Sequence, residues 1–306
     1  MTHMQNLLFY IAYALIRLVS VLPFWLVYRL SDFIYFILYY IIRYRKEVTK
    51  SNIRTAFPHF DEKEVTRIAK ASTRHFCDIF IEMMKSLHIS KEEMHKRFTC
   101  TNAEMVNAFA KADKSIVALF GHAGSYEWSM VLDEVLHFNV YAIYKPIKNK
   151  KFNQLITDIR KKFGSTMVPM RHATRVMSEK ADNERCLFAL VADQAPKRAR
   201  SQYFTNFFNK PSAVFRGGER IAAEHGLPVF FLAIKKIKRG YYETTFHKIT
   251  DDASKEPEWL VTDKFFSLLE DQIKMQPEYY LWSHKRWKTS LQDVKRDVEL
   301  SPSIQR

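Results

Sequence analysis

Two apolar runs dominate the first 46 residues. Residues 7–22 are almost wholly apolar apart from Arg17, and a second run covers 33–42 after a more polar stretch. Neither run reaches the roughly 20 uninterrupted apolar residues that span a bilayer comfortably. Aromatic residues at the ends of the runs and the basic cluster at 43–50 are typical of a segment at an anionic membrane surface. The pattern predicts an N-terminal membrane anchor over residues 1–46, either one imperfect spanning helix or two interfacial helices; a buried hairpin of a soluble protein is the alternative.

Behind the anchor the spacing of apolar residues becomes helical and then changes again. Intervals of three and four residues, as at Ile68, Ile79 and Met83, predict a helical lead-in over 47–110. From residue 115 onward, short apolar runs alternate with helical stretches, which favours an α/β fold with a mixed sheet flanked by helices. We expect one domain over 47–306, with its α/β core at 111–290. The expected strands are 115–120, 140–144, 166–168, 187–192, 229–234 and 241–247, and the expected helices are 127–136, 152–163, 174–179 and 215–224.

Composition narrows the partners and the cofactors. The chain of 306 residues has a formal net charge of +15, which indicates an anionic partner such as nucleic acid, an anionic membrane or an acidic carrier protein. Three scattered cysteines form no CxxC pair, so neither a disulfide framework nor a zinc site is expected. Nucleotide-binding glycine patterns and metal-ligand spacings are also missing from the sequence. We therefore predict no cofactor and no metal.

The most informative local pattern lies where the first predicted strand ends. The run 116–120 leads into Gly121, His122, Ala123 and Gly124, and Glu127 follows His122 after five positions. In a continuous helix the two side chains would lie about 140° apart, so they could meet only if the chain turned between them, as the glycines permit. A histidine held by a carboxylate is a common general base. The alternative is a core histidine in an ordinary strand-to-helix turn.

Several blocks along the chain resemble the late lipid A biosynthesis acyltransferases, which are lauroyl and myristoyl transferases of the lysophospholipid-acyltransferase type. The family's signature is a histidine followed five positions later by an acid, which corresponds to His122 and Glu127 here. Further similar blocks occur in the same order over nearly the whole chain. They are 52–58 (NIRTAFP), 144–149 (YKPIKN), 192–194 (ADQ), the Phe pair at 207–208 and the closing block 280–288 (YLWSHKRWK).

The resemblance implies an enzyme of the bacterial inner membrane with its catalytic domain on the cytoplasmic side. It would move an acyl chain from acyl carrier protein to an anionic glycolipid, a lipid A precursor of lipopolysaccharide biosynthesis, without an acyl-enzyme. His122 would be the general base and Glu127 its orienting partner, with Ser125 as a helix cap rather than a nucleophile. The resemblance carries over further catalytic and substrate-binding residues by position. The catalytic ones are Arg160 and Asp193, and the substrate-binding ones are Lys145, Lys148, Asn149, Gln194 and Arg198.

Some positions depart from the family's usual pattern, and other functions compete. Ser125 and Tyr126 stand in a Gly-Asn-Trp-Glu-like block, and Lys145 replaces a more usual arginine, which is not equivalent at a bidentate phosphate contact. The nearest rival is the same chemistry on a lysophospholipid, an aminolipid or another glycolipid. A basic protein that binds nucleic acid is a rival of a different class, because aromatic residues interleave with lysines. No nucleic-acid motif supports it, and we expect no nucleic acid partner.

Overall fold

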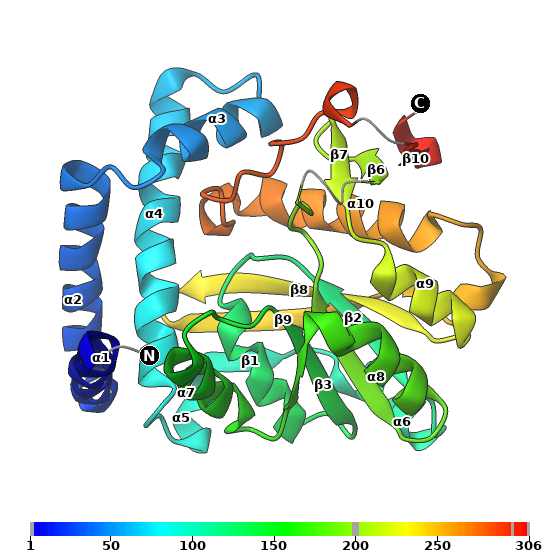
Figure 1. Ribbon diagram of the computed structural model, residues 1–306, viewed down its shortest axis with the longest axis horizontal. Coiled ribbons are helices and arrows are strands. Elements are labelled where there is room, and N and C mark those ends of the chain that lie inside the picture. Colours follow the sequence, from blue (N-terminus) through cyan, green and yellow to red (C-terminus); the bar gives the residue numbers. More distant parts are fainter. Residues whose placement is uncertain (1–2, 198–201, 295–296, 305–306) are drawn as a thin grey trace.

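The N-terminal helices lie against one side of the molecule (Figure 1). The computed structural model describes residues 3–197, 202–294 and 297–304. Helix α1 (His3–Val21) and helix α2 (Phe24–Phe36), which continues into a π-helical turn, η1 (Ile37–Ile41), precede α3 (Lys46–Ala56) and the long α4 (Glu62–Lys85). Helix α4 begins at Asp61, whose carboxylate accepts a hydrogen bond from the Glu64 amide and so caps the first turn. Helix α5 (Lys91–Arg97) leads into the sheet.

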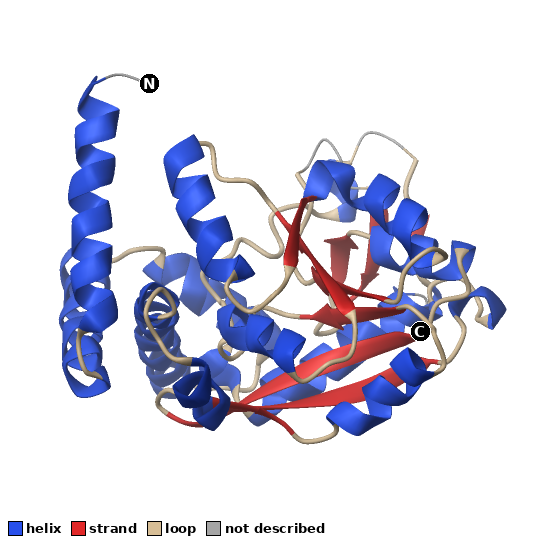
Figure 2. Cartoon of the chain, turned by 90° about the horizontal axis from the view of Figure 1, so that it is seen from below, coloured by secondary structure: helices blue, strands red, loops and turns tan. Residues whose placement is uncertain are grey.

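A seven-stranded mixed sheet forms the centre of the remaining chain, with strand order β1-β9-β8-β2-β5-β3-β4. All its neighbours are parallel except β8 and β9, which form an antiparallel hairpin. Helices cover both faces, so the expected α/β class with a mixed sheet flanked by helices is confirmed (Figure 2). The strands are β1 (Phe98–Cys100), β2 (Ile116–Phe120), β3 (Asn139–Tyr144), β4 (Thr166–Pro169), β5 (Cys186–Val191), β8 (Val229–Lys238) and β9 (Tyr241–Thr250). The helices are α6 (Ala103–Lys111), α7 (Lys150–Lys161), α8 (Ala173–Ala181), α9 (Gly217–Glu224) and α10 (Leu260–Met275).

Alternating side chains of the central strand β2 supply two separate apolar cores. Val117 and Leu119 lie in one core, together with α10 and Trp282. Ile116, Ala118 and Phe120 lie in the other. Both faces of β2 are therefore buried, as a central parallel strand requires. A second, small sheet in the order β10-β6-β7 (β6, Tyr203–Asn206; β7, Pro211–Val214; β10, Glu299–Leu300) lies above α10 in Figure 1.

Polar contacts fasten α2 alongside α4. Tyr28 donates to Glu82 at 2.9 Å, Ser31 donates to Asp78 at 2.7 Å, and Asp32 pairs with Arg74 at 2.7 Å. Within the described residues one helical stretch, 24–41, is long and apolar enough to cross a membrane by length and composition. Three polar side chains of this stretch, Tyr28, Ser31 and Asp32, are thus bound to the charged helix α4.

One predicted helix takes a different form. The stretch expected as a helix at 127–136 folds as 3₁₀ turns, η2 (Tyr126–Glu134). The expected cap at Ser125 is wrong, because its hydroxyl instead donates to Glu82 at 3.0 Å and makes no capping bond. Trp128 is fully buried and its indole donates to Ser86 at 2.9 Å. These two bonds tie the start of η2 to α4.

Candidate active site

The turn after β2 has the sharp geometry that its glycines predicted. Gly124 has a φ of +60°, and a Cβ there would lie 2.6 Å from the Ile234 side chain. A Cβ at Gly121 would lie 2.5 Å from Leu269. The turn therefore packs tightly between β8 and α10 and presents His122 at the carboxyl end of β2, where side chains of parallel sheets commonly form sites.

The carboxylate partner of His122 comes from the neighbouring strand. Asp193, just after β5, lies with its Oδ1 2.6 Å from Nδ1 of His122 and its Oδ2 3.0 Å from the His122 amide nitrogen. Burial alone would raise the pKa of Asp193, but the His122 ring, the two His122 hydrogen bonds and one from Tyr280 together hold that pKa below its ordinary value. The side chain is 2% exposed. An ionised, buried carboxylate thus fixes the ring.

Gln194 occupies the other ring nitrogen. Its side-chain amide nitrogen lies 3.1 Å from Nε2 of His122. With Nδ1–H donated to Asp193, Nε2 carries the lone pair and accepts from the Gln194 amide. The Tyr126 ring lies edge-on to the imidazole at 4.8 Å between centroids. The tautomer that carries its lone pair on Nε2 is the one that a general base needs.

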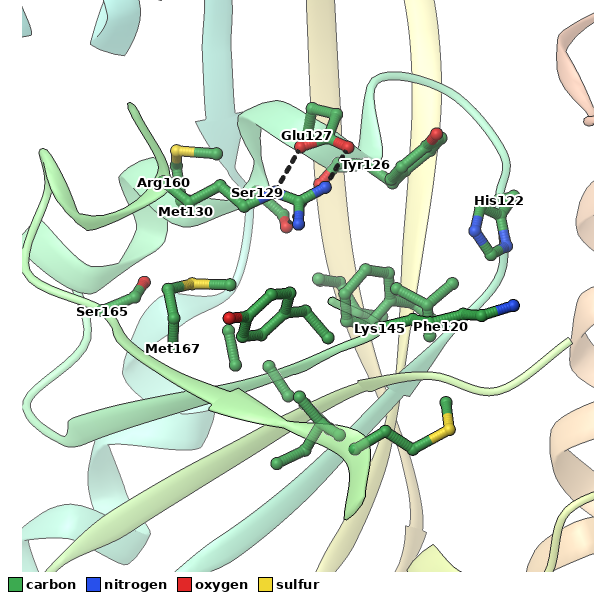
Figure 3. Close-up of a pocket in the computed structure, with 18 of the residues that line it drawn as sticks. Phe120, His122, Tyr126, Glu127, Ser129, Met130, Lys145, Arg160, Ser165 and Met167 are labelled. Atoms are coloured by element: carbon green, nitrogen blue, oxygen red, sulfur yellow. Dashed lines mark hydrogen bonds and ion pairs between the residues drawn. The ribbon is translucent and has the colours of Figure 1, made fainter. Parts of the chain in front are cut away.

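The expectation that Glu127 orients His122 is wrong in this structure. Glu127 instead forms a bidentate pair with Arg160 of α7, at 2.6 Å to Nη2 and 2.9 Å to Nε (Figure 3). The η2 turns carry Glu127 away from the His122 ring and towards α7, whereas the parallel pairing of β2 and β5 brings Asp193 to it. Burial tends to lower the pKa of Arg160, but the Glu127 charge and hydrogen bonds outweigh it and raise that pKa.

All four residues predicted as catalytic lie at or beside one cavity. It has a volume of about 540 Å³ and is lined by His122, Glu127 and Arg160, while Asp193 lies behind His122. Figure 3 shows His122 at one end and Ser165 at the other, with Met130 and Met167 near the Ser165 end. The apolar lining residues come mainly from η2, the turn after it and strands β2, β3, β4, β5, β8 and β9, and they include Met130, Leu136, Val140, Ala142, Met167, Leu187, Ala189 and Leu232. Such a long apolar cavity suits a flexible hydrocarbon chain.

A polar pair closes the end of this cavity that is distant from His122. Asp133 and Ser165 both line it, and the Ser165 hydroxyl is hydrogen-bonded to the Asp133 carboxyl. Burial raises the pKa of Asp133 to about 7, although the Ser165 bond partly opposes the shift. Near neutral pH a large share of this carboxyl is therefore protonated and uncharged.

The predicted substrate-binding residues divide between the cavity and the surface. Lys145 and Gln194 line the cavity. Asn149 caps α7 instead, since its Oδ1 accepts from the amides of Lys151 and Phe152 at 3.0 and 3.2 Å. Lys148 is exposed on the loop before α7, outside the cavity lining. Arg198 lies outside the described residues.

The closing block contributes a residue whose role the sequence did not reveal. His284 lines the cavity and accepts a hydrogen bond from the Ala195 amide at 3.2 Å. Burial lowers the pKa of His284 to about 4, despite the opposing Asp193 charge, so the ring is neutral and can accept this bond. Asn52 in turn donates to the backbone carbonyl of His284 at 2.6 Å. The blocks around residues 52 and 284 thus hold the segment that carries Asp193. In the sequence, the only sign of this contact is that both blocks resemble the same family.

A histidine with a buried carboxylate partner beside an apolar cavity is an arrangement that can take up a hydroxyl proton next to a hydrocarbon chain. The sequence matches the family of bacterial lipid A biosynthesis acyltransferases over residues 1–289. Because the match covers nearly the whole chain, the protein belongs to this family and is an enzyme that transfers acyl groups to a lipid.

Other comparisons add little to this assignment. No curated protein matches the sequence. Among solved structures, the 1-acyl-sn-glycerophosphate (LPA) acyltransferase PlsC from Thermotoga maritima is similar, with 14% identity and a TM-score of 0.39. The similarity covers 81% of this chain and 95% of that chain.

Proposed function

We propose that this enzyme moves a fatty acyl group from the thioester of acyl carrier protein to a hydroxyl of a lipid A precursor. The observation that carries the proposal is the His122–Asp193 pair at one end of an apolar cavity, in a chain of this family. The net charge of +15 suits both an acidic carrier protein and a phosphorylated glycolipid.

In the proposed reaction Nε2 of His122 accepts the proton of the acceptor hydroxyl as its oxygen attacks the thioester carbonyl carbon. Asp193 keeps Nδ1 protonated and stabilises the imidazolium that forms. Collapse of the tetrahedral intermediate breaks the carbon–sulfur bond, and the imidazolium returns the proton to the leaving thiolate. Gln194 lies where the hydroxyl must come, so its amide is displaced when the acceptor binds.

The second charged pair would position the substrates. Arg160 binds Glu127 through Nε and Nη2, and neither bond uses Nη1, which is left to donate to a phosphate or to the developing oxyanion. Lys145 lies on the same cavity and supplies a second cation (Figure 3). Glu127 thus acts through Arg160, as a positioning residue, and we replace the expected His–Glu pair by the His122–Asp193 pair.

The N-terminal helices would hold the enzyme on the cytoplasmic face of the inner membrane. Exposed apolar side chains lie along both α1 and α2, while Lys85 donates to the carbonyls of Ser20, in the last turn of α1, and of Leu22 just after it. Because α2 is bound along α4, we propose interfacial attachment rather than a free spanning helix.

Mass spectrometry of lipid A tests the acceptor and the base together. Cells that lack the gene are complemented with the wild type or with His122→Ala, and expression and membrane content are compared. Loss of one secondary acyl chain, restored by the wild type alone, is the expected result. Unchanged lipid A together with a missing phospholipid or aminolipid species would show that the acceptor is not a lipid A precursor, while acyl transfer to another lipid would still hold. Restoration by His122→Ala would overturn the assigned base.

A further inference from the structure

A second cavity lies beside α4, and it shares no lining residue with the catalytic cavity. Its volume is about 640 Å³, and it is bounded by α2, α4, the β8–β9 hairpin and Tyr279. His75 lies between the two regions, because it lines this cavity while its Nε2 lies 3.2 Å from the carbonyl oxygen of Gly124. No step of the proposed reaction uses this cavity.

Positive charge is in excess in the cavity. Two carboxylates, Asp32 and Asp78, face five cationic side chains. His75 adds no positive charge, because burial holds its pKa well below the ordinary value. The cationic residues are Arg67, Lys70, Arg74, Lys236 and Arg239.

The two carboxylates are engaged by the inner cations. Arg239 binds Asp78 at 2.6 Å and Asp32 at 2.8 Å, and Arg74 binds Asp32 at 2.7 Å. Lys236 lies 3.5 Å from Asp78. Asp32 and Asp78 therefore hold the half-buried Arg239 and the buried Lys236 in place, and they do not pair with the rim cations Arg67 and Lys70.

The rim cations are exposed and follow one face of α4. Arg67 is 54% exposed and is bound to Glu64 of the same helix, and Lys70 lies one turn further, 5.9 Å from the centre of the Tyr40 ring. Arginine and lysine side chains that converge on a hollow are the usual partners of a phosphate group. With Glu64 counted beside Asp32 and Asp78, three carboxylates face the five cations, and a phosphate at the rim would offset the excess that remains.

An exposed apolar strip borders the cavity directly. Phe36 lines it and is 52% exposed, and the strip continues through Phe33, Tyr40, Ile41 and Ile42 at 61%, 45%, 65% and 59%. A soluble phosphate makes no favourable contact with an apolar surface. An anionic lipid contacts both a cationic pocket, through its headgroup, and an apolar surface, through its acyl chains.

We propose that this cavity binds the phosphate headgroup of an anionic phospholipid, separately from the substrates of acyl transfer. The headgroup phosphate contacts Arg67 and Lys70 at the rim, and the acyl chains lie along Phe36 and its apolar neighbours on α2 and η1. One bound lipid would thereby fix the angle at which the helical side of the enzyme meets the membrane.

Calorimetric titration of the full-length enzyme in neutral detergent tests the site. The probes are dihexanoyl phosphatidylglycerol, dihexanoyl phosphatidylcholine and inorganic phosphate. The test variant Arg67→Gln/Lys70→Gln removes two exposed charges, of which Arg67 is bound to Glu64 and Lys70 lies near the Tyr40 ring. The control, Lys111→Gln/Lys255→Gln, removes two charges that are 68% and 81% exposed from elsewhere on the surface.

We expect the cavity variant to bind one phosphatidylglycerol fewer per chain, or to bind it at least fivefold more weakly, while the control equals the wild type. Unchanged stoichiometry and affinity in the cavity variant, or equal weakening in the control, would overturn the site. Phosphate binding as tight as that of the lipid would make it a soluble-anion site and overturn the lipid proposal. The outcome is independent of acyl transfer, because His122→Ala should keep this binding whether or not His122 is the base.

Discussion

Asp193 lies 71 residues beyond His122 in the chain, yet its carboxylate holds both the ring and the backbone amide of that histidine. Two bonds to one residue fix the imidazole more firmly than a single side-chain contact would. The ring therefore has little freedom to turn its acceptor nitrogen away from the cavity. Glu127, the acid five positions after His122, binds Arg160 instead.

Asp193→Asn should abolish most of the activity while leaving the fold intact. The asparagine amide can donate to Nδ1, which places the ring proton on Nε2, where it blocks proton acceptance. We expect kcat to fall by roughly 10²- to 10⁴-fold. Acyl transfer is measured with purified enzyme, acyl carrier protein thioester and lipid A precursor, and thermal unfolding of each variant is followed in parallel.

A second His–Asp pair supplies the control for that experiment. Asp182 lies 2.8 Å from Nδ1 of His225, outside the cavity, and its side chain is 65% exposed. Asp182→Asn should retain at least half of the wild-type activity. An Asp193→Asn enzyme as active as this control would show that Asp193 does not orient the base.

Glu127 and Arg160 should behave as one unit in a double-mutant cycle. Their side chains are 9% and 23% exposed, so removal of one partner leaves a poorly solvated charge on the other. Glu127→Gln and Arg160→Gln should each lower the free energy of unfolding by about 3 kcal/mol, and the double variant by clearly less than the sum. Urea unfolding monitored by tryptophan fluorescence gives the three values.

The exposed pair of Arg175 and Glu179 is the matched comparison for this cycle, at 3.0 Å on α8. Arg175→Gln should cost less than about 1 kcal/mol. Additive losses at Glu127 and Arg160 would contradict the coupling.

Arg160→Lys should also reduce kcat/KM, because lysine cannot keep the bidentate contact with Glu127 and still present a free donor.

Met167 should influence the length of the acyl chain that is transferred. It lines the cavity between the His122 end and Ser165 (Figure 3). A tryptophan there fills the far part of the cavity, so Met167→Trp should shift the preference towards shorter acyl donors. Competition between donors of different length, resolved by mass spectrometry of the product, measures the shift. Met275→Trp, at a position 75% exposed, should keep the wild-type preference. If both variants prefer the same acyl-chain length, the acyl chain does not bind beside Met167.

The sequence predicted much of the α/β core because its signals are local. The apolar run at 116–120 and the glycines after it account for β2 and for the turn that presents His122. Helix α7 was expected at 152–163 and occupies Lys150–Lys161, with Asn149 as its cap. A short strand such as β1 carries no comparable signal, since Phe98–Cys100 is held in the sheet only by its pairing with β9.

Partners within the site were harder to predict, because they depend on the order of strands. Spacing along the chain made Glu127 the natural partner of His122. Asp193 reaches His122 because β2 and β5 are neighbours in the sheet. That adjacency cannot be predicted from residues 116–120 and 187–192 alone. His284 was missed for the same reason: it reaches Ala195 only because the closing segment folds back over the turn after β5.

Asp133 should make the stability of the enzyme depend on pH, and Asp133→Asn should remove that dependence. Burial raises the pKa of Asp133 from an ordinary value of 3.8 to about 7. Since the folded protein binds this proton more tightly than the unfolded chain, the stabilisation is complete below about pH 4 and is lost as the pH rises through about 7.

Asparagine cannot ionise, and its side-chain oxygen can still accept a hydrogen bond from the Ser165 hydroxyl. Relative to wild type, the variant should therefore gain about 2 kcal/mol between pH 5 and pH 8, measured as the free energy of urea unfolding at each pH. Asp271→Asn, whose carboxylate is 65% exposed, should show no such gain, and an equal difference from wild type at both pH values for Asp133→Asn would mean that Asp133 ionises as an ordinary carboxyl.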